Sequence, residues 1–222
     1  MELFSVLRAQ SVRTIKPRAF DSISAYELVE EVKEKYKFRQ GPTTQEIASG
    51  SPTNFVFGKM PQGDHGIVIE SLNITYYAAY ATSVNAVTRS STDDADIFLN
   101  DLERWVVGKY KLDLSPLFPT NYHSQLEVGF NTSLNKRFAE LNPFGVAIGK
   151  LLRSYGFDKY PDFEPTGFSL HYDGTKPERF ASAFSLERRA GAPWQTNKFF
   201  AQAPLRTADH IAVLRQIEEW LF

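Results

Sequence analysis

The sequence predicts an α+β protein built from two tandem repeats, each with the order strand, helix, three strands, helix, and with antiparallel sheets that carry helices on one face. The leading observation is a stretch that occurs twice. TDDADIFLNDLERWV, residues 92–106, aligns without a gap with TADHIAVLRQIEEWL, residues 207–221. The matched pairs include Thr92 with Thr207, Leu99 with Leu214, Leu102 with Ile217 and Trp105 with Trp220.

Two further likenesses follow the same order along the chain. Tyr36-Lys37-Phe38 matches Tyr155-Gly156-Phe157, and a little earlier Val29 matches Ile148 and Val32 matches Leu151. Pro52-Thr53-Asn54-Phe55 matches Pro165-Thr166-Gly167-Phe168. Three colinear matches indicate an internal duplication, and duplicated halves pack about a pseudo-two-fold axis as identical subunits do in a dimer.

The predicted boundaries place the first repeat at residues 1–111 and the second at 124–222, packed as one compact unit. Residues 112–123 contain two prolines without helical periodicity and are the predicted connector. One antiparallel sheet shared by both halves, as in the saddle of TATA-binding proteins, is one way to arrange this element order. The sequence carries no motif of that family, so the likeness concerns element order alone.

In the first repeat, a loosely alternating strand opens the chain and a helix over residues 25–38 follows, with Leu28, Val29, Val32 and Tyr36 on its buried face. Residues 41–54, rich in Gly, Pro, Ser and Thr, are predicted to be a loop. Strands follow at 55–57, 67–77 and 82–90. In the second of these strands the apolar parity shifts, which predicts a bulge near Glu70-Ser71 or burial of both faces. Thr92 is the predicted cap of the next helix.

In the second repeat, an alternating strand at 126–130 precedes a helix that Asn142 caps and Pro143 opens. Its periodicity predicts that Ile148, Leu151, Leu152 and Tyr155 are buried. Strands are expected at 167–172, 180–189 and 198–203, and a helix from Thr207 closes the chain.

Composition excludes several classes of function. The 222 residues carry a net charge of −1, so no global field attracts nucleic acid or acidic lipid. There is no cysteine, which excludes disulfides, thiolate catalysis and every cysteine-based metal site. The N-terminus lacks the pattern of a signal peptide and no window is long and apolar enough for a membrane span, so a cytoplasmic protein without a membrane contact is expected.

The common nucleotide-binding and hydrolytic motifs do not occur, and no metal or cofactor is predicted. The main prediction is therefore a binding or assembly protein, acting through a protein partner or self-association rather than catalysis. Trp194, in a loop without periodicity, is the candidate interface residue, with a core position as the alternative.

Two other functions stay open. A small-ligand or catalytic pocket between the repeats would use His171, Asp173 and Arg189, because His and Asp two apart on a strand share one face; a turn at Asp173-Gly174 is the plainer explanation. A nucleic-acid interface would use basic side chains among aromatic ones on strands. Its candidates are Arg188, Arg189, Lys198 and Arg206.

Overall fold

The computed structural model describes residues 1–16, 20, 23–61, 66–77, 81–132, 137–157, 163–171 and 182–221. In this part of the chain it has five α-helices: α1 (Ala25–Lys35), α2 (Thr44–Ala48), α3 (Thr92–Tyr110), α4 (Asn142–Ser154) and α5 (Thr207–Leu221). Two 3₁₀ turns are η2 (Ala139–Leu141) and η3 (Trp194–Thr196). The strands are β1 (Glu2–Ile15), β2 (Thr53–Met60), β3 (Ile67–Tyr77), β4 (Ala81–Thr88), β5 (Asn121–Gly129), β6 (Gly167–Leu170), β7 (Phe184–Arg188) and β8 (Lys198–Ala203).

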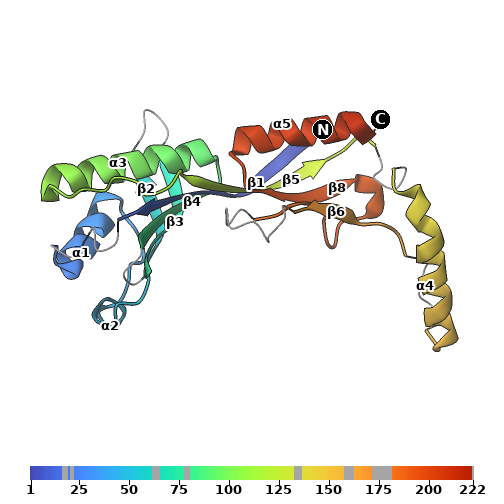
Figure 1. The fold of residues 1–222 in the computed structure, drawn as a ribbon, viewed down its shortest axis with the longest axis horizontal. Helices are drawn as coiled ribbons and strands as arrows, with labels where there is room; N and C mark the ends of the chain where they lie inside the picture. The colour runs from blue at the N-terminus through green and yellow to red at the C-terminus, as the bar shows by residue number, and fades with distance from the viewer. Residues whose placement is uncertain are drawn as a thin grey trace. The chain divides into compact units, whose positions relative to one another are not determined.

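The eight strands form one antiparallel sheet in the order β2-β3-β4-β1-β5-β8-β7-β6 (Figure 1). The predicted α+β class is confirmed. The chain forms two compact units. Unit 1 contains residues 1–5, 125–203 and 209–222, and unit 2 contains residues 6–124 and 204–208.

Unit 2 has a core between its strands and the helices α1 and α3. The residues predicted to form the buried face of α1 do so, and Tyr36 is 1% exposed. Its ring packs edge-on against Phe98 at 4.8 Å and lies 6.4 Å from Trp105, both on α3, and its hydroxyl donates to Asp101 at 2.9 Å. Phe38 lies 5.2 Å from Phe55 of β2. The end of α1 is thus fixed in a pocket formed by α3 and β2.

The start of α3 differs from the prediction at its cap. Ser91 is the N-cap, and its hydroxyl accepts from the amide of Asp94 at 3.0 Å. Thr92 instead bonds to Thr207. Each threonine donates its buried backbone N–H to the hydroxyl of the other, at 3.0 Å in both directions. Ser91 has the extended backbone of an N-cap (φ −157, ψ 161), whereas Thr92 lies one position inside the helix and accepts from the amide of Thr207.

The parity shift in β3 is real, but no residue is inserted there. The buried residues change from Ile67 and Ile69 to Leu72 and Ile74. The register of β2 with β3 stays in step on both sides of the change, as Val56 pairs with Ser71 and Gly58 with Ile69. Phe57, between them on β2, has a left-handed backbone with φ 55 and is exposed. The buried side thus changes at the same place in β2 and in β3, so the two strands stay in register without an inserted residue.

The predicted loop over residues 41–54 contains a helix. Thr43 caps α2 through a capping box, because its hydroxyl accepts from the amide of Glu46 and the Glu46 carboxylate accepts from the amide of Thr43. The five residues of α2 are too few to display an apolar period, which is why composition pointed to a loop.

Unit 1 contains the strands β6, β7 and β8 and most of α5. Phe168 pairs with Leu186 across β6 and β7, and Leu186 with Ala201 across β7 and β8. Its buried apolar residues include Leu126, Val128, Leu186, Phe199, Ala201 and Leu214.

The helix α4 contradicts two predictions. Asn142 is its first residue and Leu141 occupies the N-cap, without a side-chain hydrogen bond. More importantly, Ile148, Leu151 and Tyr155 were predicted to be buried and are exposed, and Leu152 is half-buried. The helical periodicity correctly placed these side chains on one face of the helix. In the described part of the chain, however, that face is exposed and not packed on a core.

Candidate protein-interaction surface

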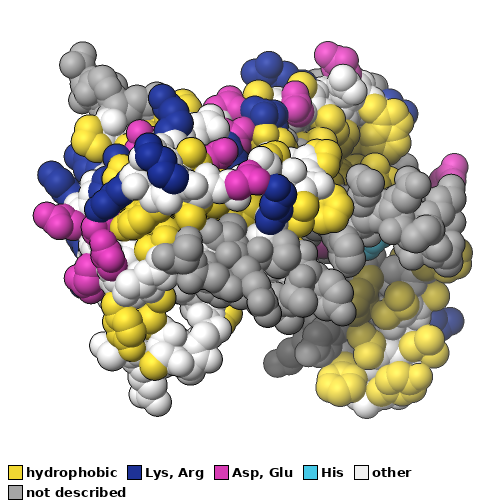
Figure 2. All heavy atoms as spheres, turned by 60° about the vertical axis from the view of Figure 1, so that its left-hand side comes forward, with side chains coloured by type: hydrophobic (Ala, Val, Ile, Leu, Met, Phe, Trp, Pro, Cys, Tyr) yellow, Lys and Arg dark blue, Asp and Glu magenta, His cyan; other side chains and the backbone are white. Residues whose placement is uncertain are grey.

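One face of α4 carries a row of exposed apolar side chains. Leu141, Phe144, Ile148, Leu151 and Tyr155 make up this row, which we call the α4 face. Their spacing of three and four residues places them in line, as in the seam of a coiled coil. Phe144 is 67% exposed, Leu151 54% and Tyr155 69%. Figure 2 shows hydrophobic side chains gathered over this helix.

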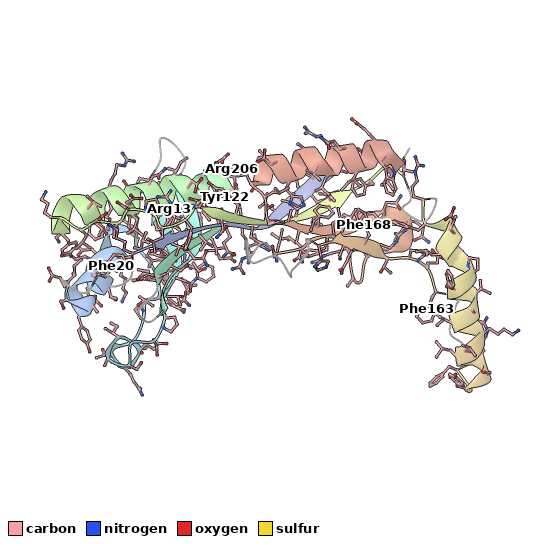
Figure 3. All side chains as sticks on the ribbon, in the orientation of Figure 1. Arg13, Phe20, Tyr122, Phe163, Phe168 and Arg206 are labelled. Carbon is pink, nitrogen blue, oxygen red and sulfur yellow. The ribbon has the colours of Figure 1, made fainter. Side chains whose placement is uncertain are left out.

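A neighbouring side of α4 packs against its own chain through glycine. Gly145 and Gly149 are the buried residues of the helix. A Cβ built on Gly145 would lie 1.9 Å from the carbonyl oxygen of Phe163, and the amide of Phe163 donates to the carbonyl of Gly145 at 3.3 Å. This close approach needs a residue without a side chain. It holds α4 by one side, at Phe163, which Figure 3 shows beside this helix, and the α4 face stays exposed.

A second apolar feature of unit 1 lies between β6 and α5. It is a groove of about 460 Å³, which we call the β6–α5 groove. Its described lining is Phe138, Phe168, Ser169, Leu170, Val213, Gln216, Ile217 and Trp220. Leu170 and Trp220 in this lining are at least half exposed. The rings of Phe138 and Phe168 lie 6.0 Å apart, and Phe138 packs edge-on against Trp220 at 6.2 Å. The groove is therefore apolar, aromatic and open to solvent.

Three of the four candidate nucleic-acid residues lie together at one end of β7 and β8. Arg188 pairs with Phe199 in the ladder, and its guanidinium lies over that ring at 5.4 Å. Burial lowers the pKa of the Arg188 guanidinium, against the charge of Glu164. The amide of Arg189 donates to the carbonyl of Lys198 at 2.9 Å, and its side chain lies 3.7 Å from the carboxylate of Glu127. Each of these two arginines thus has a neighbour within the chain.

Lys198, the third of these residues, extends over the ring of Phe4, with its ammonium 4.4 Å from the ring centre. Arg206, the fourth candidate, belongs to unit 2. It forms ion pairs with Asp93 at 3.0 Å and Asp96 at 3.1 Å and lies 4.4 Å over the ring of Tyr122.

Arg206 is part of a polar network at the start of α3, which Figure 3 shows with Arg13 and Tyr122. The Asp96 carboxylate accepts from the hydroxyls of Ser11 at 2.7 Å and Tyr122 at 2.9 Å. Arg13 donates to Glu103 at 2.8 Å. Burial, followed by the bond to Asp96, raises the pKa of the Tyr122 hydroxyl. The network ties β1, α3 and β5 together, and sequence reasoning missed it because its partners are far apart in the chain.

Of the candidate pocket residues, the structure places His171 and Arg189 at opposite ends of the β6–β7 pair. Gly167 pairs with Glu187 and Leu170 with Phe184, so β6 and β7 run in opposite directions. His171 follows Leu170 at one end of this strand pair, whereas Arg189 follows β7 at the other end. Asp173 lies outside the described residues. The backbone of Trp194 begins η3, and its side chain is likewise outside the described part.

Two hollows of unit 2 differ in what they can hold. The first, among β1, β3, β4, α1 and α3, has a volume of about 30 Å³ and is lined mainly by core residues. That is room for no more than a few water molecules, so it is not a ligand site. The second measures about 600 Å³ and is lined by Phe57, Gly66, Ile67, Val68, Glu70, Arg89, Ser90 and Asp94. Two of the three charged residues in this described lining, Arg89 and Glu70, pair with each other at 2.5 Å.

Comparison with known proteins adds no family: no protein-family model and no curated protein matches this sequence. Among the described residues, no three or more His, Asp or Glu side chains lie close enough together to hold a metal ion. Within the same residues, no helix is long and apolar enough to cross a membrane.

Proposed function

We propose that this protein is a non-catalytic binding or assembly module that acts through protein–protein contacts, and that the α4 face is its contact surface. The observation that carries this proposal is the row of five apolar side chains in line on an exposed helix face. A helix of a water-soluble protein normally turns such a row to the core. Contiguous exposed apolar surface on that scale is typical of interaction sites.

The composition of α4 supports the same proposal. Its charged residues are Lys150 and Arg153 alone. The helix α1 at the matching place of the first repeat carries glutamates and lysines outward and buries its apolar row. A helix with so few charges gains little from solvent exposure, so covering the α4 face with protein is favourable.

The internal duplication is part of the proposal. Thr92 and Thr207, matched by sequence, donate to each other in both directions, as residues related by a two-fold axis do. Numbered within each repeat, the strand order 2-3-4-1 of the first half is followed by 1-4-3-2 in the second. Both observations support a duplicated repeat arranged about a pseudo-two-fold axis. A cytoplasmic location remains our prediction for this protein.

The test is a charge placed on the α4 face. In an Ile148→Asp/Leu151→Asp protein, two exposed side chains change, so the melting temperature should stay within a few degrees of wild type. Association should be lost, measured by light scattering and by quantifying co-purified protein. Lys150→Ala, on the same helix but off the α4 face, is the control and should associate as wild type does. Equal association of all three proteins would refute the proposal.

A further inference from the structure

We propose that the β6–α5 groove of one copy receives the end of α4 from a second copy, so that two chains exchange these helices. This inference rests on the proposed function and names the partner as the same chain. Two likenesses support it. The helix α4 resembles α1, and the β6–α5 groove resembles the site that holds the end of α1 in unit 2.

The groove is lined by the counterparts of the residues that hold Tyr36. In unit 2, Tyr36 packs on Phe98 and Trp105 and donates to Asp101. In the alignment of residues 92–106 with 207–221, Phe98 matches Val213, Trp105 matches Trp220 and Asp101 matches Gln216. All three matching residues line the groove. Phe55, which holds Phe38, matches Phe168 of the same lining.

The residues that would fill the groove are present and largely exposed. Tyr36 matches Tyr155 and Phe38 matches Phe157. Tyr36 is 1% exposed, whereas Tyr155 is 69% and Phe157 50% exposed. Val29 and Val32, buried in unit 2, match Ile148 and Leu151 of the α4 face. Unit 1 therefore has both a helix face and a groove that suit each other, each left open.

The Tyr155 hydroxyl would also find a partner. Tyr36 donates to a carboxylate oxygen of Asp101, and the side-chain oxygen of the matching Gln216 can accept in the same way. A tyrosine that buries its ring needs such an acceptor for its hydroxyl. The groove therefore provides the apolar walls and the polar partner that this helix end requires.

The apolar area is large enough for a stable dimer. The five side chains of the α4 face are 44% to 69% exposed. At roughly 200 Å² for a large side chain, they leave on the order of 500 Å². Exchange between two copies would cover two such faces and a similar area of two grooves, on the order of 2,000 Å² in total, against about 1,200–2,000 Å² for a specific interface.

A second copy fits better than the helix of the same chain. In each chain α4 is held by the contact of Gly145 with the backbone of Phe163, with its face bare and its own groove open. The structure shows α4 with its face exposed while this contact is in place. Exchange of an identical element between two copies keeps it, and reciprocal exchange is a low-cost route to a closed dimer.

The experiment uses the absence of cysteine from the chain. In unit 2, Lys35 lies 3.1 Å from Asp101, and these residues match Ser154 and Gln216. A full-length Ser154→Cys protein is mixed with a Gln216→Cys protein of distinguishable tag and treated with a short bismaleimide. Both substituted side chains are exposed. Gln216→Cys removes the acceptor of the Tyr155 hydroxyl but leaves Tyr155 and the apolar walls of the groove in place. The expected product is a mixed species of two 25.2 kDa chains.

Two controls sharpen the result. A Ser154→Cys protein mixed with Ser90→Cys, an exposed residue of unit 2 outside both features, should give at least tenfold less mixed product. Adding Leu151→Asp to the Ser154→Cys protein should lower the yield by a similar factor, while circular dichroism and melting temperature stay unchanged.

The double variant Ser154→Cys/Gln216→Cys separates the alternatives. A cross-linked single chain, without mixed product, would mean that α4 closes on its own groove and would overturn the exchange. No cross-link in either arrangement would also overturn it. If in that case the Ile148→Asp/Leu151→Asp protein still loses a co-purifying partner, the proposed function stands and only self-exchange fails. If that variant associates as wild type does, both proposals fail.

Discussion

Replacing Thr92 or Thr207 by valine tests the contact between the start of α3 and the start of α5. Valine keeps the shape of threonine and removes the hydroxyl. In Thr92→Val, the buried amide of Thr207 loses its acceptor, and in Thr207→Val the amide of Thr92 does so. The two hydroxyls are buried, so water cannot readily replace either of them.

The magnitude follows from an orphaned buried donor. Each single substitution should lower the free energy of unfolding by about 1–3 kcal/mol, the cost of leaving one buried amide unpaired. The two bonds use different donors and acceptors, so the double variant should lose about 2–6 kcal/mol if their effects add. That is a large share of a typical stability of about 5–15 kcal/mol.

The assay is equilibrium unfolding in urea, followed by far-ultraviolet circular dichroism. Thr75→Val is the control, because valine suits its half-buried position on strand β3. Its free energy of unfolding should stay within about 0.5 kcal/mol of wild type. If Thr92→Val and Thr207→Val both fall within this range, the reciprocal bonds do not fix the helix starts, and the duplication loses its strongest contact.

Three further substitutions test the packing of the helices. Gly145→Ala should destabilise the attachment of α4 and speed its amide exchange, because the new Cβ would meet the carbonyl of Phe163. Gly108→Ala should instead stabilise α3 by about 0.5–1 kcal/mol, because nothing lies within 4 Å of its new Cβ. Slower or unchanged exchange in Gly145→Ala would contradict the close contact. Burial, and then the bond to Asp101, raises the pKa of Tyr36 above its ordinary value of 10.0, so its contribution to stability is complete below pH 10 and is lost as the pH rises further. Between pH 8 and about pH 11, the urea midpoint should therefore fall less for Tyr36→Phe than for wild type, because a phenylalanine cannot ionise. An equal fall in both proteins would place Tyr36 outside the core.

Sequence reasoning worked where one local period or one turn residue determines the structure. The helical spacing of Leu28, Val29, Val32 and Tyr36 predicted the buried face of α1 correctly. The bounds of β3 and β8 also agree with the prediction. The helix α2 was missed because its five residues carry no apolar period, and Ser91 was missed as a cap because the partner of Thr92 lies 115 residues away.

Pairs between distant segments were also beyond prediction. The basic residues of β1 and the acidic residues of α3 lie far apart in the sequence. The structure joins them, since Arg13 pairs with Glu103 and lies 3.8 Å from Asp96. The sequence gives no spacing rule for such a contact, because it depends on the register of β1 against β4 and on where α3 lies over the sheet.

A periodic pattern is often taken to identify both an apolar face and the surface that covers it. The helix α4 shows that the pattern identifies only the face. Its spacing identifies Ile148, Leu151 and Tyr155 as one apolar face, which the structure bears out, because all three share the α4 face. The pattern does not identify the surface that covers this face. In α1 the same spacing meets a core within its own unit. In α4, Gly145 allows a close contact on a neighbouring side of the helix, and the apolar row stays exposed. If the two repeats arose by duplication, as we propose, one apolar face can pack on a core in the first repeat and stay exposed in the second. The spacing of its apolar residues is the same in both.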